Sequence, residues 1–202
     1  MVGRQGFRRS HTLRLGAIMG KRSNFDRIHR DKYYTPIKAV EPLIDHLPYG
    51  GFTYAEPCCG DGRLIEHLNT LPDASAVCNY YADVEPECEG AYQVDALKMV
   101  PDIPADYLIT NPPWDRKFLH PFIETWLPLM PMWLLFDADW AYTKQAAPYL
   151  TRCQKIVTVG RVRWLEDSKM QSKDSCSWYL FDEQHDGPTE FYGRLIEGVN
   201  GG

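Results

Sequence analysis

The chain has 202 residues, enough for one ordinary domain with a substantial core. Its 44% hydrophobic and 24% charged residues are typical of a globular protein, and no run of about 18 apolar residues predicts a membrane span. The formal net charge of −5 argues against a general polyanion binder, although it leaves room for a local basic surface.

The first 23 residues are expected to form a basic, disordered tail. Residues 1–30 carry eight Lys or Arg residues and a single acid, Asp26. The apolar stretch LGAIMG is too short for the hydrophobic region of a secretory signal. A mitochondrial transit peptide, a nucleic-acid-binding arm and a tail read from a start codon upstream of Met19 are all compatible with this composition.

Six cysteines, at positions 58, 59, 78, 88, 153 and 176, include no CxxC pair. Cys78 and Cys153 fall in apolar, strand-like runs, which suits small buried side chains. Without a secretory signal, we expect reduced thiols and a cytoplasmic protein. No clustered ligands have the spacing of a zinc site, so no metal is expected.

Residues 35–47 have the pattern of a helix. Thr35 is placed to be its N-cap, and Pro36 suits the first helical position. Apolar residues recur at helical spacing at positions 39, 40, 43, 44 and 47. Pro42 interrupts this pattern, and the turn PYGG ends it.

The middle of the chain alternates strand-like and helix-like segments. Strand patterns occupy residues 52–57, 75–86, 106–114 and 130–140, and helical patterns occupy residues 61–71, 118–127 and 141–150. Such alternation predicts an α/β fold with a mostly parallel sheet. Two further strands, at 153–164 and 174–182, have no helix between them and are expected to pair antiparallel at one edge.

The first strand runs into a glycine turn, EPCCGDG, at residues 56–62. Gly60 and Gly62 let the backbone turn sharply and let a ligand approach closely. The third glycine of a dinucleotide fingerprint is missing, as is the lysine of a P-loop. Glu56 and Asp61 make the turn acidic, which suits a ligand with an amine or cationic centre, such as S-adenosylmethionine, better than pyrophosphate. The alternative is an ordinary turn with Asp61 serving the next helix.

Acidic residues also follow the next two segments. Asp83 stands 21 residues after Gly62, near the expected end of a strand, and its carboxylate can accept hydrogen bonds from ribose hydroxyls. Asp95, in VDAL, can accept from an adenine amino group, or it can cap the residues that follow. A solvated acid at a strand end is the alternative for Asp83.

The strand that begins near residue 106 runs into the motif TNPPW, residues 110–114. Pro112 and Pro113 remove two backbone donors and fix two φ angles, so the strand stops in a rigid corner. This corner carries the amide of Asn111 and the ring of Trp114. Taken alone, these two residues also fit an ordinary turn and a core aromatic.

In this order, YYTP, EPCCGDG, ADVEP, VDAL and TNPPW resemble the motifs of S-adenosylmethionine-dependent amino-methyltransferases, in particular N6-adenine DNA methyltransferases. Short phage-encoded members are similar over residues 24–182, including RDKYYTPIKAVEPLI and GRVRWLEDSKMQSKDSCSWYLF. The resemblance implies a Rossmann-like class I methyltransferase fold, with a mostly parallel seven-stranded sheet, an antiparallel edge strand and helices on both faces. It also implies the cytoplasm of a bacterium or a phage-infected host.

The resemblance assigns site residues motif by motif. The residues that it places against S-adenosylmethionine are Tyr34, Thr35, Pro36, Glu56, Pro57, Gly60, Gly62, Asp83, Asp95 and Asn111. The side chain of Asn111 and the backbone carbonyl of Pro112 would accept the two hydrogens of the target amine and aim its lone pair at the methyl group. Trp114 would stack on an adenine flipped out of duplex DNA.

Larger relatives carry a separate target-recognition domain, and this sequence has no room for one. Residues 24–185 are expected to form one methyltransferase domain, and residues 186–202 a loosely ordered C-terminal extension. Loops would then contact the DNA, unless they are plainly solvated. The basic residues that can reach phosphates are Arg116, Lys117, Arg161, Arg163, Lys169 and Lys173.

Three functions are compatible with the sequence. The leading interpretation is methyl transfer to the N6 amine of adenine in DNA. The same corner suits transfer to RNA adenine or guanine, or to a protein glutamine amide, because all of these are planar, conjugated nitrogens. The third is a non-catalytic module that binds S-adenosylmethionine, against which the intact NPPW motif argues.

Overall fold

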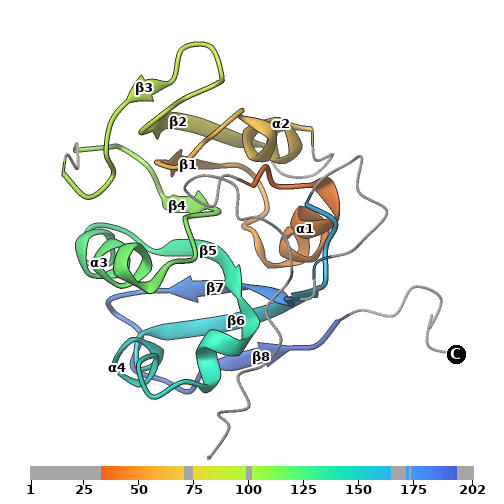
Figure 1. The fold of residues 1–202 in the computed structure, drawn as a ribbon, viewed down its shortest axis with the longest axis vertical. Coiled ribbons are helices and arrows are strands. Elements are labelled where there is room, and N and C mark those ends of the chain that lie inside the picture. Colours follow the sequence, from red (N-terminus) through yellow and green to blue (C-terminus); the bar gives the residue numbers. More distant parts are fainter. Residues whose placement is uncertain (1–32, 71–74, 99–101, 165–171, 173, 195–202) are drawn as a thin grey trace, which may run out of the picture.

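The computed structural model describes residues 33–70, 75–98, 102–164, 172 and 174–194. They form an eight-stranded sheet with helices on both faces (Figure 1). The strand order is β3-β2-β1-β4-β5-β7-β6-β8. The segment expected to be a basic tail, residues 1–23, lies outside the described residues.

Five strands make up the parallel part of the sheet. They are β1 (Phe52–Glu56), β2 (Ala76–Asp83), β3 (Tyr92–Gln93), β4 (Tyr107–Thr110) and β5 (Met132–Asp137). Parallel pairing brings the carboxyl ends of β1, β2 and β4 to one edge of the sheet. The glycine turn, Asp83 and the NPPW corner follow these three ends, so the fold gathers them in one place.

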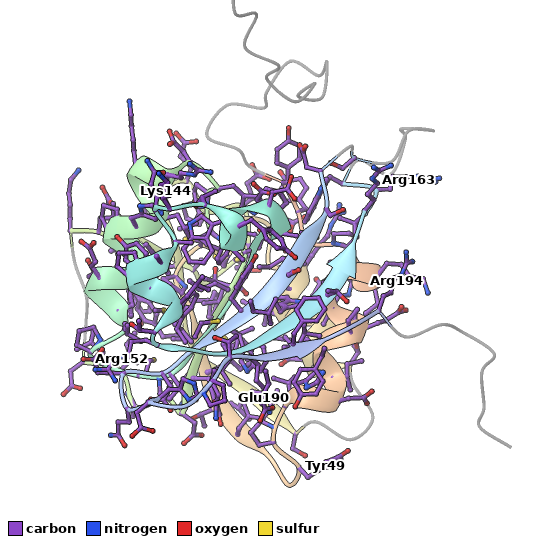
Figure 2. All side chains as sticks on the ribbon, turned by 90° about the horizontal axis from the view of Figure 1, so that it is seen from below. Tyr49, Lys144, Arg152, Arg163, Glu190 and Arg194 are labelled. Atoms are coloured by element: carbon purple, nitrogen blue, oxygen red, sulfur yellow. The ribbon has the colours of Figure 1, made fainter. Side chains whose placement is uncertain are left out.

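The antiparallel strand lies inside the sheet. β7 (Cys176–Phe181) pairs antiparallel with both β5 and β6 (Cys153–Gly160). The expected antiparallel pairing of these last two strands is confirmed, but their expected place at the edge is wrong. β8 (Glu190–Tyr192) pairs parallel to β6 and forms that edge; Figure 2 shows Glu190 on it and Arg194 just beyond.

Two very short strands add to the six strand patterns of the sequence, so the sheet has eight strands where the resemblance implied seven. β3 has two residues and β8 has three, too few to leave an alternating pattern in the sequence. β8 lies within the extension expected at residues 186–202, of which residues 195–202 lie outside the described residues. Its residues pair with β6, and the hydroxyl of Thr158 donates to the carbonyl of Tyr192 at 3.0 Å.

The helices pack in two groups on the two faces of the sheet (Figure 1). One group contains α1 (Ile37–Val40), the 3-10 helix η2 (Glu41–His46) and α2 (Arg63–Asn69), and the other contains α3 (Arg116–Trp126), the 3-10 helix η3 (Ala138–Tyr142) and α4 (Ala147–Leu150). Each group covers its own hydrophobic core. Along β5, Trp133 and Leu135 face the first core, whereas Leu134 and Phe136 face the second.

Two of the three predicted helices that contain a proline are broken up in the structure, whereas α3 continues through Pro121. Pro36, not Thr35, is the N-cap of α1, so the capping role predicted for Thr35 is wrong. Pro42 has no N–H to continue the α-helical ladder, and the chain goes on as η2. Residues 141–150, expected to form one helix, contain the end of η3 and, with Pro148 in its first turn, α4.

Candidate functional site

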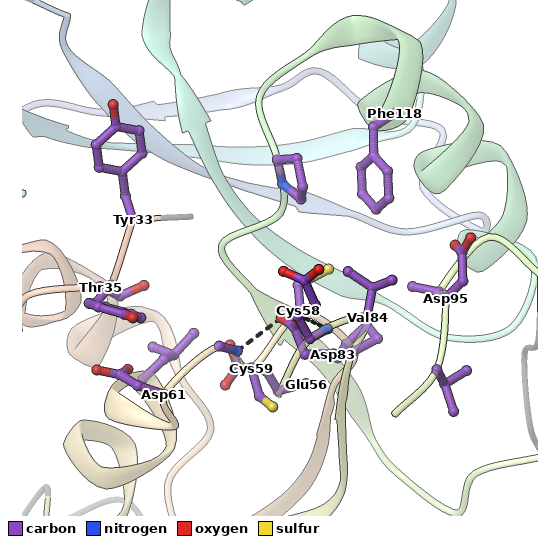
Figure 3. A pocket seen from close by; sticks show the side chains of 18 of the residues that line it. Tyr33, Thr35, Glu56, Cys58, Cys59, Asp61, Asp83, Val84, Asp95 and Phe118 are labelled. Atoms are coloured by element: carbon purple, nitrogen blue, oxygen red, sulfur yellow. Dashed lines mark hydrogen bonds between the residues drawn. The ribbon is translucent and has the colours of Figure 1, made fainter. Parts of the chain in front are cut away.

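A cavity of about 670 Å³ opens at the carboxyl ends of β1, β2 and β4 (Figure 3). Seven of the ten residues expected to bind S-adenosylmethionine line it: Tyr34, Thr35, Glu56, Pro57, Gly60, Asp83 and Asp95. Pro36 and Gly62 do not line it, although each follows a residue that does. Asn111 does not line it either, but Pro113 of the same corner does.

The two glycines of the turn have different roles. Both have positive φ, 53° at Gly60 and 86° at Gly62, where a side chain would be strained. A Cβ on Gly60 would lie 3.7 Å from the ring of Tyr34, an ordinary contact, so the need for glycine here comes from the backbone angle alone. A Cβ on Gly62 would come 3.0 Å from the Cβ of Cys88, so this glycine serves packing beside the cavity.

Asp83 is held by two backbone donors. Its Oδ2 accepts from the N–H of Gly60 at 3.0 Å, and its Oδ1 accepts from the N–H of Glu85 at 2.8 Å. The first bond ties the end of β2 to the glycine turn (Figure 3). Each oxygen keeps a second lone pair, so the carboxylate can also accept from a ligand.

Glu56 is a buried acid without a full set of partners. Its side chain is 1% exposed, and within the described residues its Oε2 has no hydrogen-bond partner. Burial, and then the carboxylates of Asp83 and Asp61, raise the pKa of Glu56 well above its ordinary value. A buried oxygen of this kind is costly unless a ligand donates to it, which an amine in the cavity would do.

Residues 33–35 cover the glycine turn and form one wall of the cavity. The Tyr34 hydroxyl donates to Glu87, and this bond, together with burial, raises the pKa of Tyr34 to about 12. The guanidinium carbon of Arg63 lies 5.1 Å from the centroid of the Tyr34 ring. The Nε of Arg63 is 2.8 Å from Asp61 Oδ2. Gly62 is the N-cap of α2, but Asp61 Oδ1 accepts from the N–H of Arg63, the first residue of that helix, at 3.1 Å, so Asp61 also serves the helix N-terminus.

Asn111 is fixed by three hydrogen bonds. Its Nδ2 donates to the carbonyl of Tyr33 and to the hydroxyl of Thr35, both at 3.2 Å. Its Oδ1 accepts from the indole N–H of Trp114 at 3.1 Å. These bonds use both amide hydrogens and leave the oxygen one more lone pair, so the side chain faces a ligand as an acceptor.

Trp114 is half-buried and bonded to the sheet as well as to Asn111. Its indole N–H also donates to the carbonyl of Leu135 in β5, at 3.1 Å. Its ring meets Trp164 edge-on with the centroids 5.5 Å apart, and Trp164 lies 6.1 Å from Tyr33. Three aromatic side chains from distant segments therefore gather around Asn111. The sequence prediction missed Tyr33 and Trp164, because nothing local marks them as neighbours of the corner.

The far end of the cavity is formed by Asp95 and Phe118, opposite Thr35 and Asp61 (Figure 3). Asp95 Oδ1 accepts from the N–H of Leu97 at 3.0 Å, and its Oδ2 lies 3.0 Å from Lys98 Nζ. The capping role considered for Asp95 is therefore compatible with a place in the cavity wall. The sequence prediction missed most of the apolar lining: Leu64, Val84, Val94, Ala96, Leu97 and Phe118.

The basic residues expected to contact phosphates lie only partly within the described residues. Arg116, Lys117, Arg161 and Arg163 are exposed, whereas Lys169 and Lys173 lie outside the described residues. Arg116 Nη1 donates to the side chain of Gln145 at 2.8 Å. Arg163 precedes Trp164, which contacts Tyr33 of the cavity wall.

Within the ranges that the structure describes, no group of three or more His, Cys, Asp or Glu side chains is placed to hold a metal ion. Nor does any helix in those ranges have the length and apolar character needed to cross a membrane.

Comparisons with known proteins bear on the fold. No protein family and no curated protein matches the sequence. A class I S-adenosylmethionine-dependent methyltransferase from Listeria monocytogenes is similar in structure, with a TM-score of 0.51 and 14% identity, over 80% of this chain and 64% of that one. A dimethyladenosine transferase from Plasmodium falciparum has a TM-score of 0.49 and 20% identity, over 74% of this chain and 62% of that one.

A third similar structure is the 23S rRNA methyltransferase ErmE, with a TM-score of 0.48 and 13% identity, over 76% of this chain and 70% of that one. This chain spans less than two thirds of the length of the first two proteins. The expected fold class is confirmed: the chain has the Rossmann-like α/β fold of class I S-adenosylmethionine-dependent methyltransferases.

Proposed function

We propose that this protein transfers a methyl group from S-adenosylmethionine to the N6 amine of adenine in DNA. Direct displacement at the NPPW corner is the proposed reaction. The observation that carries the proposal is the state of Asn111, whose amide is fixed as an acceptor beside the acidic cavity. The fold supports methyl transfer, and the order of the sequence motifs supports adenine in DNA.

The cavity residues fit S-adenosylmethionine in charge and in chemistry. Asp83 can accept from the ribose hydroxyls, and Asp95, at one end, can accept from the adenine amine. The Oε2 of Glu56, buried without a partner among the described residues, can accept from the α-amino group. The surrounding carboxylates favour the ammonium and sulfonium charges of the cofactor, which supplies an activated methyl group when bound.

Asn111 and Pro112 would act on the target amine. The lone pair of such an amine is delocalised into its ring, which makes the nitrogen a poor nucleophile. Acceptance of its two hydrogens by Asn111 Oδ1 and the carbonyl of Pro112 would favour a pyramidal nitrogen, which withdraws the lone pair from conjugation with the ring and aims it at the methyl group. No strong base is needed, because the nitrogen becomes acidic as its bond to carbon forms and then loses a proton to solvent.

The surroundings of Asn111 favour a nucleobase over a glutamine amide. Tyr33, Trp114 and Trp164 present aromatic surface around the corner, which suits a planar ring. Stacking of a base on an aromatic side chain contributes about 1–3 kcal/mol, which offsets part of the cost of flipping the base out of a duplex. An aliphatic amide has no ring to gain from these contacts.

Exposed basic residues support a nucleic-acid partner. Arg116 and Lys117 follow the NPPW corner directly, and Arg161 and Arg163 follow the end of β6. Side chains of this kind commonly contact phosphates and position the protein on the strand. The phosphate contacts proposed for Lys169 and Lys173 are predictions from the sequence, and RNA adenine or guanine is the alternative substrate.

The test is the fate of a labelled methyl group. Wild-type protein is incubated with methyl-labelled S-adenosylmethionine and with unmethylated plasmid DNA, total RNA or cell lysate, and label is counted in each. We expect label in DNA, and we expect Asn111→Ala to reduce it at least about 100-fold, as removal of a polar group that stabilises a transition state does elsewhere. Asn69→Ala, an exposed asparagine at the end of α2, is the matched control.

Thermal unfolding of both variants checks that each is folded. If label appears only in RNA or only in lysate protein, that fraction contains the substrate and the assignment of DNA is wrong. Undiminished label in DNA after Asn111→Ala would overturn the catalytic assignment.

A further inference from the structure

Two free thiols lie in contact beside the cavity. The Sγ atoms of Cys59 and Cys88 are 3.5 Å apart, although 29 positions separate the two residues in the sequence. Cys59 belongs to the glycine turn and lines the cavity (Figure 3), whereas Cys88 lies in the loop between β2 and β3. The fold therefore brings two oxidisable groups together at the cavity wall.

The surroundings of the two thiols leave a disulfide within reach. Its sulfurs would have to approach by about 1.5 Å, to a bond length of about 2.05 Å. Cys59 is held in place, because its N–H donates to the carbonyl of Ala82 at 2.9 Å and its carbonyl accepts from the N–H of Gly62 at 2.8 Å. A Cβ on Gly62 would lie 3.0 Å from the Cβ of Cys88, so glycine there lets Cys88 come close to the turn. The movement must then come mainly from Cys88 and its loop.

The two thiols differ in how easily an oxidant reaches them. Cys59 is 5% exposed, whereas Cys88 is half-buried. Burial, and then the hydrogen bond with Cys88, raise the pKa of the Cys59 thiol, which disfavours its thiolate. An oxidant from solvent should therefore react first with Cys88, and Cys59 should react second.

A shift of the Cys88 loop would reach the wall of the cavity. The N–H of Glu87, the residue before Cys88, donates to the carbonyl of Gly60 at 2.9 Å. Glu87 also accepts a hydrogen bond from the hydroxyl of Tyr34. Gly60 and Tyr34 both line the cavity, so the loop and the wall are joined by these two bonds.

We propose that Cys59 and Cys88 form an oxidation site, and that their disulfide weakens binding of the cofactor in the adjacent cavity. The weakening rests on the proposed cofactor, whereas formation of the disulfide does not. The proposed oxidant is a peroxide.

The chemistry of hydrogen peroxide illustrates the two steps. The Cys88 thiolate attacks one peroxide oxygen, the O–O bond breaks, and the products are a sulfenic acid and, after protonation, water. Cys59 then attacks the Cys88 sulfur, so that the S–S bond forms while the S–O bond breaks and a second water leaves. The two thiols together lose two electrons and two protons, which reduce the peroxide to water.

Mass spectrometry tests the oxidation site directly. Reduced protein is treated with hydrogen peroxide, its remaining thiols are blocked, and its unreduced peptides are sequenced by fragmentation. We expect a peptide pair joined through Cys59 and Cys88, which Cys59→Ser and Cys88→Ser both lack. Cys78→Ser is the matched control, since Cys78 is also half-buried but its Sγ donates to the carbonyl of Tyr80 at 3.3 Å. This variant should give the same joined pair as wild type.

Calorimetry with S-adenosylhomocysteine tests the effect on the cavity. We expect peroxide to weaken binding to wild-type protein and to Cys78→Ser at least about tenfold, and dithiothreitol to restore it. Cys88→Ser should bind as reduced wild type does, before and after peroxide. Methionine oxidation is excluded as the cause where dithiothreitol restores binding, because a thiol does not readily reduce the sulfoxide.

The other outcomes contradict the proposal in distinguishable ways. Absence of the joined peptides, or a pair that contains Cys58 in place of Cys59, would mean that the oxidation site is wrong. Equal binding by oxidised and reduced wild type would refute the effect on the cofactor. Weaker binding after peroxide in Cys88→Ser as well would assign that effect to another group. Failure of reduced wild type to bind S-adenosylhomocysteine would overturn the proposed cofactor, while the peptides still decide the oxidation site.

Discussion

Glu56 makes the stability of the protein depend on pH in a definite direction. Burial and the carboxylates of Asp83 and Asp61 raise its pKa in the folded chain above the ordinary value of 4.5. As pH rises above 4.5, the unfolded chain loses this proton while the folded chain keeps it. The free energy of unfolding therefore falls from pH 4.5 toward the folded-state pKa.

Glu56→Gln should remove this dependence, because an amide does not titrate. Without ligand, the variant should match wild type near pH 4 and become progressively more stable than wild type as pH rises from 4.5 toward the folded-state pKa of Glu56. It should also bind S-adenosylhomocysteine about tenfold more weakly, since an amide cannot give up a proton to become the carboxylate that would pair with the ligand's ammonium group. Urea unfolding across this pH range and calorimetry measure the two effects. Asp186→Asn, at an exposed acid, is the control, and a stability difference that is constant with pH would contradict the prediction.

Gly62 is required by its backbone angle and by its neighbour, and the two effects can be separated. A non-glycine residue at its φ of 86° costs about 1–2 kcal/mol. Gly50 has a φ of 90° and nothing within 4 Å of an added Cβ, so Gly50→Ala measures the backbone cost alone. We expect Gly62→Ala to lower the free energy of unfolding by roughly a further 1 kcal/mol, because its Cβ would crowd Cys88 at 3.0 Å. Chemical denaturation measures the free energy of unfolding of both variants. Equal losses would show that the contact with Cys88 adds no cost at position 62.

Among the elements, α3 and η3 are joined by a hydrogen bond that protonation would break. The indole N–H of Trp140 donates to Nε2 of His120 at 3.0 Å, so this ring must be neutral. Burial, and then the charge of Arg116, lower the pKa of His120 below 6.5, while Glu124 opposes the shift. Below pH 6.5, His120 takes up a proton in the unfolded chain but stays neutral in the folded chain. The free energy of unfolding therefore falls as pH drops.

His120→Gln should weaken this dependence, because an amide oxygen can accept the same indole N–H without titrating. Between pH 6.5 and 5, the stability of the variant should fall less steeply than that of wild type. His46 also has a pKa lowered by burial, so His46→Gln is the control for the remaining slope. Urea unfolding at each pH supplies the data; identical slopes for wild type and His120→Gln would refute the role of the α3–η3 bond.

Strands were more predictable than helices, for a physical reason. All of β7, and all of β5 except Asp137, are buried, so their apolar runs are continuous and easily read. The helices at 35–47 and 141–150 depend on how the chain adapts to Pro42 and Pro148, which periodicity alone does not reveal. The edge strands β3 and β8 form because β2 and β6 present backbone N–H and C=O groups with which they pair. This pairing depends on tertiary contacts and leaves no pattern in the local sequence.

On the scale of the whole molecule, the position of the site was easier to predict than the contacts that hold it together. Motifs that follow parallel strands must meet at one edge of the sheet, and the cavity lies there. The bonds from Tyr34 to Glu87 and from Asn111 to Tyr33 join residues 53 and 78 positions apart. Such bonds depend on the conformations that the loops adopt over the sheet. The sequence pattern therefore indicated the site residues but not their hydrogen-bond partners.

β8 closes one edge of the sheet, and its removal should affect the whole molecule. A chain that ends at Thr189 loses the pairing of β8 with β6, the bond from Thr158 to Tyr192 and the contact of Tyr192 with His46, whose ring centroids are 4.3 Å apart. We expect the free energy of unfolding to fall by about 1–3 kcal/mol. The uncovered edge of β6 should also promote association between chains, which light scattering detects. A chain that ends at Arg194 keeps β8 and should match the full-length protein; equal stability and equal scattering for the two truncated chains would show that β6 needs no cover.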